Sequence, residues 1–401
     1  MAAARVGEPF DPVTGLPESR ARDVSWFEHA CGYVEMKWPR AAAKSRKSIA
    51  EAMTTVTLAL LANRRGRPDD DSLRTALYGW SFSPARHAVD PPAEISAALA
   101  WISKASLPVA ILRDMTTLRR VLDSLSRCID GTPAAPTTMY RKRAVFYNAL
   151  GYAVERKLLP TNPIDQVQWS APEVAETIDR RVVASPAQVK QLLAAVRSQG
   201  SQGEHLHAFF AVLYYAGLRP SEAVALRLHN CVLPPSGWGR LDLTTSEPRA
   251  GHSWTDGDGP RDARGLKHRS PDEVRSVPIP PTLVGILRRH IETYSDGPDA
   301  RIFRSVRGGP LAETAYARVW RAARYQALTP AQVSSPLARR PYDLRHACAS
   351  LMLNAGVPAT EAARRLGHSV AMLLKRYANC IDGQERAANE RIAQALDDDR
   401  V

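Results

Sequence analysis

Long apolar runs are absent from this chain, and their absence excludes several classes of protein. The longest candidate, around Thr57 to Ala62, is far shorter than the roughly 20 residues that a helix needs to span a bilayer. Glu8 and Asp11 stand where a secretory signal would carry its apolar segment, so we expect no signal peptide and no membrane partner. Cysteines are few and scattered, which argues against a disulfide framework or a zinc knuckle and favours a reducing cytoplasm: Cys31, Cys128, Cys231, Cys348 and Cys380.

The sequence also lacks a clustered pair of carboxylates of the kind that two-metal chemistry uses. His205 and His207 are the nearest thing to a metal motif, but no carboxylate or cysteine stands at a matching spacing. A position flanking an ordinary helix is the simpler interpretation of both. We therefore expect no metal and no cofactor.

Acidic residues are outnumbered, and this imbalance indicates the partner. The 401 residues contain 54 Lys and Arg against 41 Asp and Glu, which gives a net charge of +13. A basic protein favours a polyanion, and double-stranded DNA is the partner we expect. The length predicts two or three domains with hydrophobic cores.

The N-terminal part shows helical periodicity throughout, and no internal repeat interrupts it. Apolar residues recur at helical spacing in six segments, and Pro160 and Pro163 follow the last of them. The segments are 24–36, 45–61, 71–80, 92–102, 111–128 and 138–157. A polar stretch follows, so we place a helical domain at 1–177, with a possible N-terminal extension, and a second domain at 178–401. Two basic clusters near helix starts are candidate DNA-backbone contacts, although a solvated helix face is the alternative: Lys44, Arg46 and Lys47, and Arg141, Lys142 and Arg143.

The second domain begins with a clear helix signal and contains the only strand character. Ser185, Pro186 and Gln188 form a capping box. A helix over 206–216 ends at Gly217, which leaves Arg219 in a turn where Glu222 could orient its guanidinium. Strands are predicted at 241–245 and 274–279, joined by a long polar insertion that carries Lys267. The expected fold class is therefore mainly α with a small β-sheet.

The C-terminal third brings together residues suited to attack on a phosphodiester. Tyr342 and Arg345 are three apart, so both can project from one face of a helix start. A second helix ends at Gly367, after which His368 is exposed on a turn and a third helix carries Tyr377. Side chains lean toward the helix N-terminus, so we expect the Tyr377 phenol to reach back toward His368. Arginine meets phosphate bidentately and stays charged, and the tyrosine would be the nucleophile.

Four motifs together resemble the tyrosine recombinase, or phage integrase, family. They are AGLRPSE at 216–222, DLRH at 343–346, LGHS at 366–369 and RYA at 376–378. Their order and spacing carry the resemblance, which covers about 181–391, whereas the N-terminal half resembles the family's helical core-binding domain only loosely.

The resemblance implies a site-specific recombinase that breaks and rejoins DNA through a 3′-phosphotyrosyl bond. Arg219 and Arg345 would clamp the scissile phosphate, His368 would help to bind it, and Lys267 would protonate the departing 5′ oxygen. Tyr377 would attack, and the ester energy would be conserved.

Two departures from the family pattern concern proton transfer. The family usually has histidine where this chain has Tyr342, and a phenol cannot replace an imidazole acid or base at neutral pH. The second departure is the length of the insertion around Lys267, which remains the best candidate because the strand residues 277–280 follow it. His346, after the motif arginine, is expected to support the site or to be a buried, hydrogen-bonded histidine.

The resemblance also implies an assembly. A C-terminal tail helix over 385–396 would pack onto a neighbour, or alternatively fold back on its own domain. We expect a homotetramer on paired sites, accessory DNA-bending or directionality factors, and a cytoplasmic enzyme associated with the bacterial nucleoid when active. The alternatives are a type IB topoisomerase-like enzyme and an inactive DNA-binding accessory protein.

Overall fold

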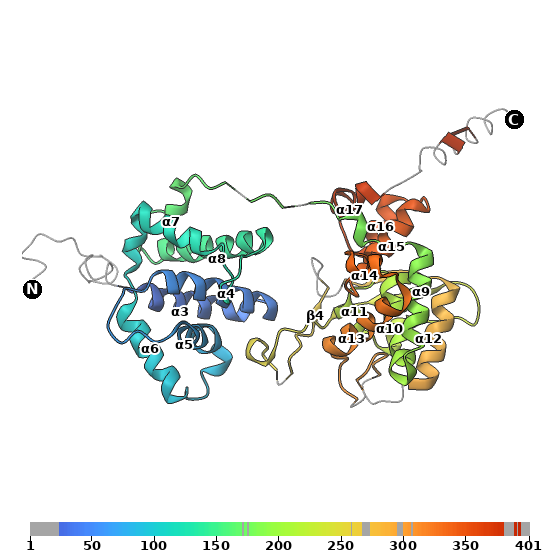
Figure 1. The fold of residues 1–401 in the computed structure, drawn as a ribbon, viewed down its shortest axis with the longest axis horizontal. Coiled ribbons are helices and arrows are strands. Elements are labelled where there is room, and N and C mark those ends of the chain that lie inside the picture. Colours follow the sequence, from blue (N-terminus) through green and yellow to red (C-terminus); the bar gives the residue numbers. More distant parts are fainter. Residues whose placement is uncertain are drawn as a thin grey trace, which may run out of the picture. The chain divides into compact units, whose positions relative to one another are not determined.

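The computed structural model describes residues 24–170, 172–174, 176–257, 259–266, 273–294, 300–305, 308–380, 389–390 and 392–393. Their contacts divide the chain into two compact units (Figure 1). The N-terminal unit comprises Met1–Val174 together with Arg249–Asp262, and the C-terminal unit comprises Ala175–Pro248 and Ala263–Val401. None of the described helices is both long and apolar enough to cross a membrane.

The N-terminal unit is a helical bundle in which α4 packs against α3, α7 and α8. Trp26, Met53 and Phe146 are fully buried in its core. The indole of Trp26 donates to Thr57 Oγ1 at 3.1 Å, which satisfies its polar edge inside the bundle. The main helices are α3 (Trp26–Lys37), α4 (Ala43–Ala59), α5 (Asp70–Arg74), α6 (Ala93–Ala105), α7 (Met115–Ser124) and α8 (Pro136–Glu155).

The tip of the long insertion belongs to this bundle. Trp254, in a short 3₁₀ turn, is almost fully buried and its ring lies 5.1 Å from that of Tyr78. Arg46 donates to both carboxylate oxygens of Asp256 at 2.7 and 2.8 Å, and to the Trp254 carbonyl at 3.1 Å. The stretch Arg249–Asp262, which the sequence shows only as part of a polar insertion, is therefore an integral part of the helical unit.

These contacts correct part of the predicted DNA-binding set. Arg46 is buried and held by Asp256, and Lys142 is fully buried, donating to the Arg127 carbonyl at 2.7 Å and to Thr55 Oγ1 at 3.1 Å. Neither side chain is available to a DNA backbone in this structure. The remaining predicted contacts are exposed or half-buried: Lys44, Lys47, Arg141 and Arg143.

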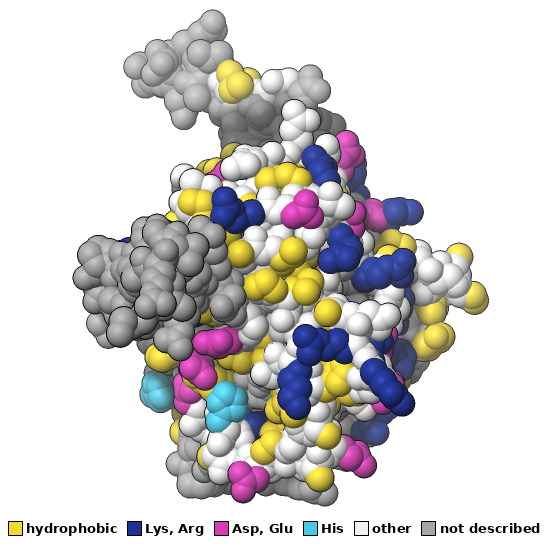
Figure 2. All heavy atoms as spheres, turned by 90° about the vertical axis from the view of Figure 1, so that its left-hand side faces the viewer, with side chains coloured by type: hydrophobic (Ala, Val, Ile, Leu, Met, Phe, Trp, Pro, Cys, Tyr) yellow, Lys and Arg dark blue, Asp and Glu magenta, His cyan; other side chains and the backbone are white. Residues whose placement is uncertain are grey.

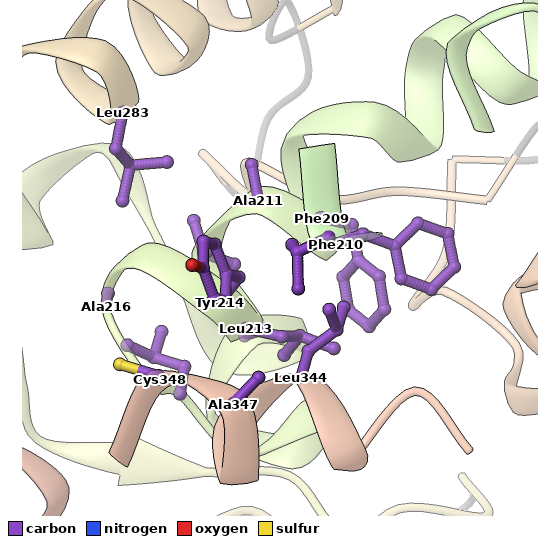
Figure 3. Packing of buried hydrophobic residues seen from close by; sticks show 14 of the residues in the cluster. Phe209, Phe210, Ala211, Leu213, Tyr214, Ala216, Leu283, Leu344, Ala347 and Cys348 are labelled. Atoms are coloured by element: carbon purple, nitrogen blue, oxygen red, sulfur yellow. The ribbon is translucent and has the colours of Figure 1, made fainter. Parts of the chain in front are cut away.

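The C-terminal unit has a core of packed helices and a small β-sheet at one side. Helix α10 supplies Phe209, Phe210 and Leu213, which pack among residues that include Leu344 and Ala347 of α15 (Figure 3). The helices are α9 (Pro186–Arg197), α10 (Gly200–Tyr215), α11 (Pro220–Ala225), α12 (Pro281–Tyr294), α13 (Glu313–Ala327), α14 (Pro330–Ser334), α15 (Asp343–Asn354), α16 (Ala359–Leu366) and α17 (Val370–Tyr377).

The sheet is antiparallel, with the order β1, β2, β5. Strand β2 pairs with β5 in a register that places Leu241 opposite Val277. Alternate residues face the core because side chains alternate across a strand. A second pair, β3 with β4, opens the insertion. The strands are β1 (Cys231–Val232), β2 (Gly239–Leu243), β3 (Thr245–Ser246), β4 (Arg264–Gly265) and β5 (Arg275–Ile279). The predicted mainly α fold with a small sheet is confirmed.

Candidate active site

A buried carboxylate organises the arginines of the site. Glu222 lies in the first turn of α11, where its Oε2 accepts from the Arg219 backbone NH at 2.8 Å and its Oε1 accepts from Arg219 Nη1 at 2.6 Å. Arg275 of β5 donates to the same two oxygens at 3.0 and 2.7 Å. Burial alone would raise the pKa of Glu222, but the guanidinium groups of Arg275, Arg345 and Arg219 outweigh it and hold this pKa below its ordinary value. Glu222 therefore stays ionised and fixes the guanidinium of Arg219.

Arg275 is a site residue that the sequence analysis missed. It is buried in strand β5 on the same face as Val277 and Ile279. The period-two pattern is the signal that could have found it, because an arginine in step with two core residues must have an acidic partner inside.

Arg345 is fully buried near the start of α15 and joins three segments. Its Nη1 donates to the Gly217 carbonyl and its Nη2 to the Leu366 carbonyl. Arg219 Nη2 reaches the same turn, donating to the Gly367 carbonyl at 3.4 Å. The two arginines are therefore held by the backbone that ends helices α10 and α16.

Two glycines make this approach possible. Gly217 and Gly367 both have φ of 62°, a left-handed conformation that favours glycine. A Cβ at Gly367 would stand 2.5 Å from Arg275 Nη1, and a Cβ at Gly217 would stand 2.6 Å from Leu366 Cδ2. The turns carrying Arg219 and His368 can come together only because both positions lack a side chain.

His368 follows Gly367 and is paired with Arg345. Its Nε2 lies 2.9 Å from Arg345 Nη2. A guanidinium can only donate, so Nε2 accepts and Nδ1 carries the proton. Burial, with Arg345 and Arg219 nearby, lowers the pKa of His368 to about 3, so the imidazole is neutral in the free protein.

Apart from Nε of Arg275, two buried donors of the site have no acceptor among the described residues: Nδ1 of His368 and Nε of Arg345. Buried donors left unpaired cost about 1 to 3 kcal/mol each. An anion bound beside them would supply the missing acceptors.

Tyr377 ends helix α17 and is fully buried, with its phenol pointing into the site. The ring stacks at 6.4 Å from that of His368, as the expected direction of the side chain requires, but its hydroxyl hydrogen-bonds His346 Nδ1 at 2.8 Å. Burial raises the pKa of Tyr377, so the phenol keeps its proton in the free protein. Ser369 caps this helix by accepting from the Met372 NH at 3.2 Å.

Tyr342 sits at the start of α15 between the arginines and His346. Its ring meets that of His346 edge-on at 5.0 Å, and its phenol lies near the guanidinium of Arg219. Among the predicted site residues, the structure thus brings together Arg219, Glu222, Tyr342, Arg345, His346, His368 and Tyr377. Lys267 lies outside the described residues.

Metal ligands are not gathered anywhere in the part of the chain that the structure describes. The groups around Tyr377 are charged arginines and neutral histidines, a set that suits a phosphate rather than a cation.

Comparison with solved structures shows a shared fold. The integrase of the Tn1549 transposon, solved in complex with a circular intermediate DNA, superposes with a TM-score of 0.52 and 16% identity, over 77% of this chain and 96% of that one. The same integrase bound to transposon right end DNA gives a TM-score of 0.51 and 16% identity, over 77% and 97%. No curated protein matches the chain in sequence.

Residues 183–382 match the phage integrase family, and this range contains every described residue of the site. The motifs, the geometry and the match agree. The chain belongs to the phage integrase family and is a tyrosine recombinase.

Proposed function

We propose that this protein recombines DNA at specific sites by cleaving and rejoining strands through Tyr377. One observation carries the proposal: Arg219, Arg345, His368 and Tyr377, which come from four segments, converge on one buried position. Arginine forks and a neutral histidine donor beside a phenol are the groups that binding and attacking a phosphodiester require.

In this proposal the arginines and His368 bind the scissile phosphate. Arg219 and Arg345 hold its nonbridging oxygens, and the unpaired Nδ1–H of His368 and Nε–H of Arg345 donate to the same group. Donors already fixed before the reaction need no reorganisation as charge develops in the transition state. Glu222 and Arg275 position these donors and do not touch the substrate.

Tyr377 attacks phosphorus and forms a 3′-phosphotyrosyl bond, while Lys267 protonates the departing 5′ oxygen. Ionising a phenol of pKa about 10 at pH 7 costs roughly 4 kcal/mol, at about 1.36 kcal/mol per pKa unit. The positive charge of the two arginines offsets part of this cost. The covalent ester conserves the energy of the broken bond, so no nucleotide cofactor is needed for rejoining.

The N-terminal helical unit is proposed as a second DNA-binding domain. The Tn1549 integrase, which shares the fold, was solved on transposon DNA, and double-stranded DNA is the substrate class we assign here. Figure 2 views the protein from the side of this unit and shows several Lys and Arg side chains among apolar and acidic ones. Lys44, Lys47 and Arg141 are its exposed candidates for phosphate contacts.

Assembly follows from the same proposal. Four copies on two paired sites, linked by tail helices, would couple cleavage to synapsis, and accessory factors would set the direction. Most of the predicted tail, residues 385–396, lies outside the described residues.

The test uses duplexes selected from a random-sequence pool by binding to the full chain. Each selected duplex is nicked so that the short strand beyond the cleavage point diffuses away and the covalent product accumulates. Denaturing electrophoresis should show a DNA-linked band with the native protein and none with Tyr377→Phe. Tyr325→Phe is the matched control, because Tyr325 is exposed on α13 and is not one of the residues that form the site.

Other results would replace the proposal. A covalent band that persists in Tyr377→Phe contradicts the nucleophile. Relaxation of plasmids lacking any selected site identifies a topoisomerase-like enzyme, and tight binding without a covalent product identifies an accessory protein.

A further inference from the structure

The Tyr377 hydroxyl makes its hydrogen bond with a histidine that is not one of the proposed phosphate-binding residues. His346 Nδ1 lies 2.8 Å from Tyr377 Oη, and both side chains are buried. His346 sits one residue after Arg345 in α15, whereas Tyr377 ends α17. The reacting oxygen is therefore already within proton-transfer distance of an imidazole before any substrate binds.

The direction of this hydrogen bond follows from the protonation states. Burial, with Arg376, Arg345 and Arg340 nearby, lowers the pKa of His346 to about 3, so the ring is neutral. Burial raises the pKa of Tyr377, so the phenol keeps its proton. The phenol therefore donates to Nδ1, which holds a lone pair, and the ring proton of His346 sits on Nε2.

The other groups near Tyr377 are not available to accept its proton. His368 uses its Nε2 lone pair to accept from Arg345 at 2.9 Å. Glu222 is bound by Arg219 and Arg275. Tyr342 occupies the position at which the family pattern has an imidazole, and its phenol cannot accept a proton at neutral pH. Among the described residues, His346 is the base that touches the reacting oxygen.

We propose that His346 takes the proton of Tyr377 during strand cleavage and returns it during rejoining, an inference that rests on the recombinase function proposed above. As Oη bonds to phosphorus, the bond from phosphorus to the 5′ oxygen breaks and the Oη proton passes to Nδ1. The 5′ oxygen takes its proton from a separate acid, the role given to Lys267. In rejoining, every transfer runs backwards, so atoms and charges balance.

The surroundings of His346 make this transfer depend on DNA. Arg345 on its own helix, Arg340 before it and Arg376 on α17 all disfavour an imidazolium, while Tyr342 and Tyr377 are uncharged partners in ring contact. In the free protein the proton therefore stays on the phenol. A phosphodiester anion held by Arg219 and Arg345 counters this field, and the forming P–O bond removes the proton affinity of Oη. The nucleophile is consequently ionised only when a phosphate is in place.

The experiment replaces the base and then makes the phenol more acidic. Asparagine at position 346 can still accept the phenol's hydrogen bond but cannot take its proton. In the nicked-duplex assay, His346→Asn should slow formation of the covalent band about 100-fold to 10,000-fold, the usual worth of a general base, with unchanged DNA affinity. Replacing Tyr377 with 3,5-difluorotyrosine should restore much of the lost rate, because a more acidic phenol depends less on a base to remove its proton.

A matched histidine separates proton transfer from structure. His368→Asn, in the same site, should also form the covalent band slowly, but 3,5-difluorotyrosine should not restore its rate. A bridging 5′-sulfur leaving group, which removes the need for an acid, should leave the His346→Asn defect in place. If Asn at 346 unfolds the protein, His346→Gln is put through the same comparison.

The outcomes distinguish this inference from the proposed function. Absence of a Tyr377-dependent covalent band in the native protein contradicts the recombinase. Two other results would overturn His346 as the base and leave the recombinase function in place, provided that the native protein forms the band. In one, His346→Asn forms the covalent band at the native rate. In the other, His346→Asn is slow and difluorotyrosine at position 377 does not restore its rate.

Discussion

At the residue scale, the site depends on one carboxylate placed among several guanidinium groups. Glu222 binds Arg219 and Arg275 directly and lies 3.9 Å from Arg345 Nη1. Without it the three guanidinium groups, of which Arg275 and Arg345 are buried, would repel one another, and a buried charge left without a partner is costly. The electrostatic field that suits the site to phosphate is thus stable only because a negative charge is buried beneath it.

Glu222→Gln should therefore destabilise the protein by about 3 to 5 kcal/mol at neutral pH, the cost of breaking a buried ion pair. The folded-state pKa of Glu222 lies below the unfolded value of about 4.3. Its stabilisation is then complete above that value and is lost as the pH falls toward the folded-state pKa. Urea unfolding at pH 7 and at more acidic pH should show the difference between variant and native protein shrinking in acid.

Glu361→Gln is the matched control for this measurement. Glu361 also accepts from two arginines, Arg364 and Arg365, but on the partly exposed surface of α16. Its loss should cost roughly 1 kcal/mol or less. Equal costs for the two variants would show that the buried carboxylate is not the organising group.

At the element scale, helix ends position the chemistry. The glycine stops at Gly217 and Gly367 and the capping box at Ser185 follow from local sequence, and the structure has all of them. The strands β2 and β5 follow from alternating apolar residues. Partners far apart in the chain do not follow. Nothing near Arg46 in the sequence indicates Asp256, so the local basic cluster predicts a DNA contact, whereas the structure buries Arg46 against Asp256.

Gly367→Ala tests the turn between α16 and α17. The backbone there has φ of 62°, and a Cβ would meet Arg275 Nη1 at 2.5 Å. A left-handed alanine costs about 1 to 2 kcal/mol, and displacing Arg275 disturbs Glu222 as well. We expect a lower melting temperature together with loss of covalent-band formation.

Gly285→Ala provides the comparison for that variant. Gly285 lies in α12, where a Cβ would meet nothing within 4 Å. Alanine should stabilise this helix by about 0.5 to 1 kcal/mol. A Gly367→Ala protein as stable and as active as Gly285→Ala would contradict the argument.

At the scale of the whole molecule, one segment belongs to a different unit from the residues that flank it in sequence. Residues 249–262 stand in sequence within the half that carries the catalytic motifs, yet they complete the core of the N-terminal unit. Composition could mark this stretch as a polar insertion, but not as part of a distant core. The one large apolar side chain within it, Trp254, is the residue that packs there, with Trp38 and Tyr78.

Trp254→Ala should therefore weaken the N-terminal unit and spare the C-terminal one. Removing a buried tryptophan typically costs about 3 to 5 kcal/mol, whereas Trp238→Ala, at a side chain 61% exposed, should change stability by no more than about 0.5 kcal/mol. Hydrogen exchange locates the effect: amides of α3 and α4 should exchange faster in Trp254→Ala, while those of α10 should keep their native rates. Faster exchange in α10 alone would mean that the insertion stabilises the unit from which it emerges in sequence, and not the one in whose core Trp254 is buried.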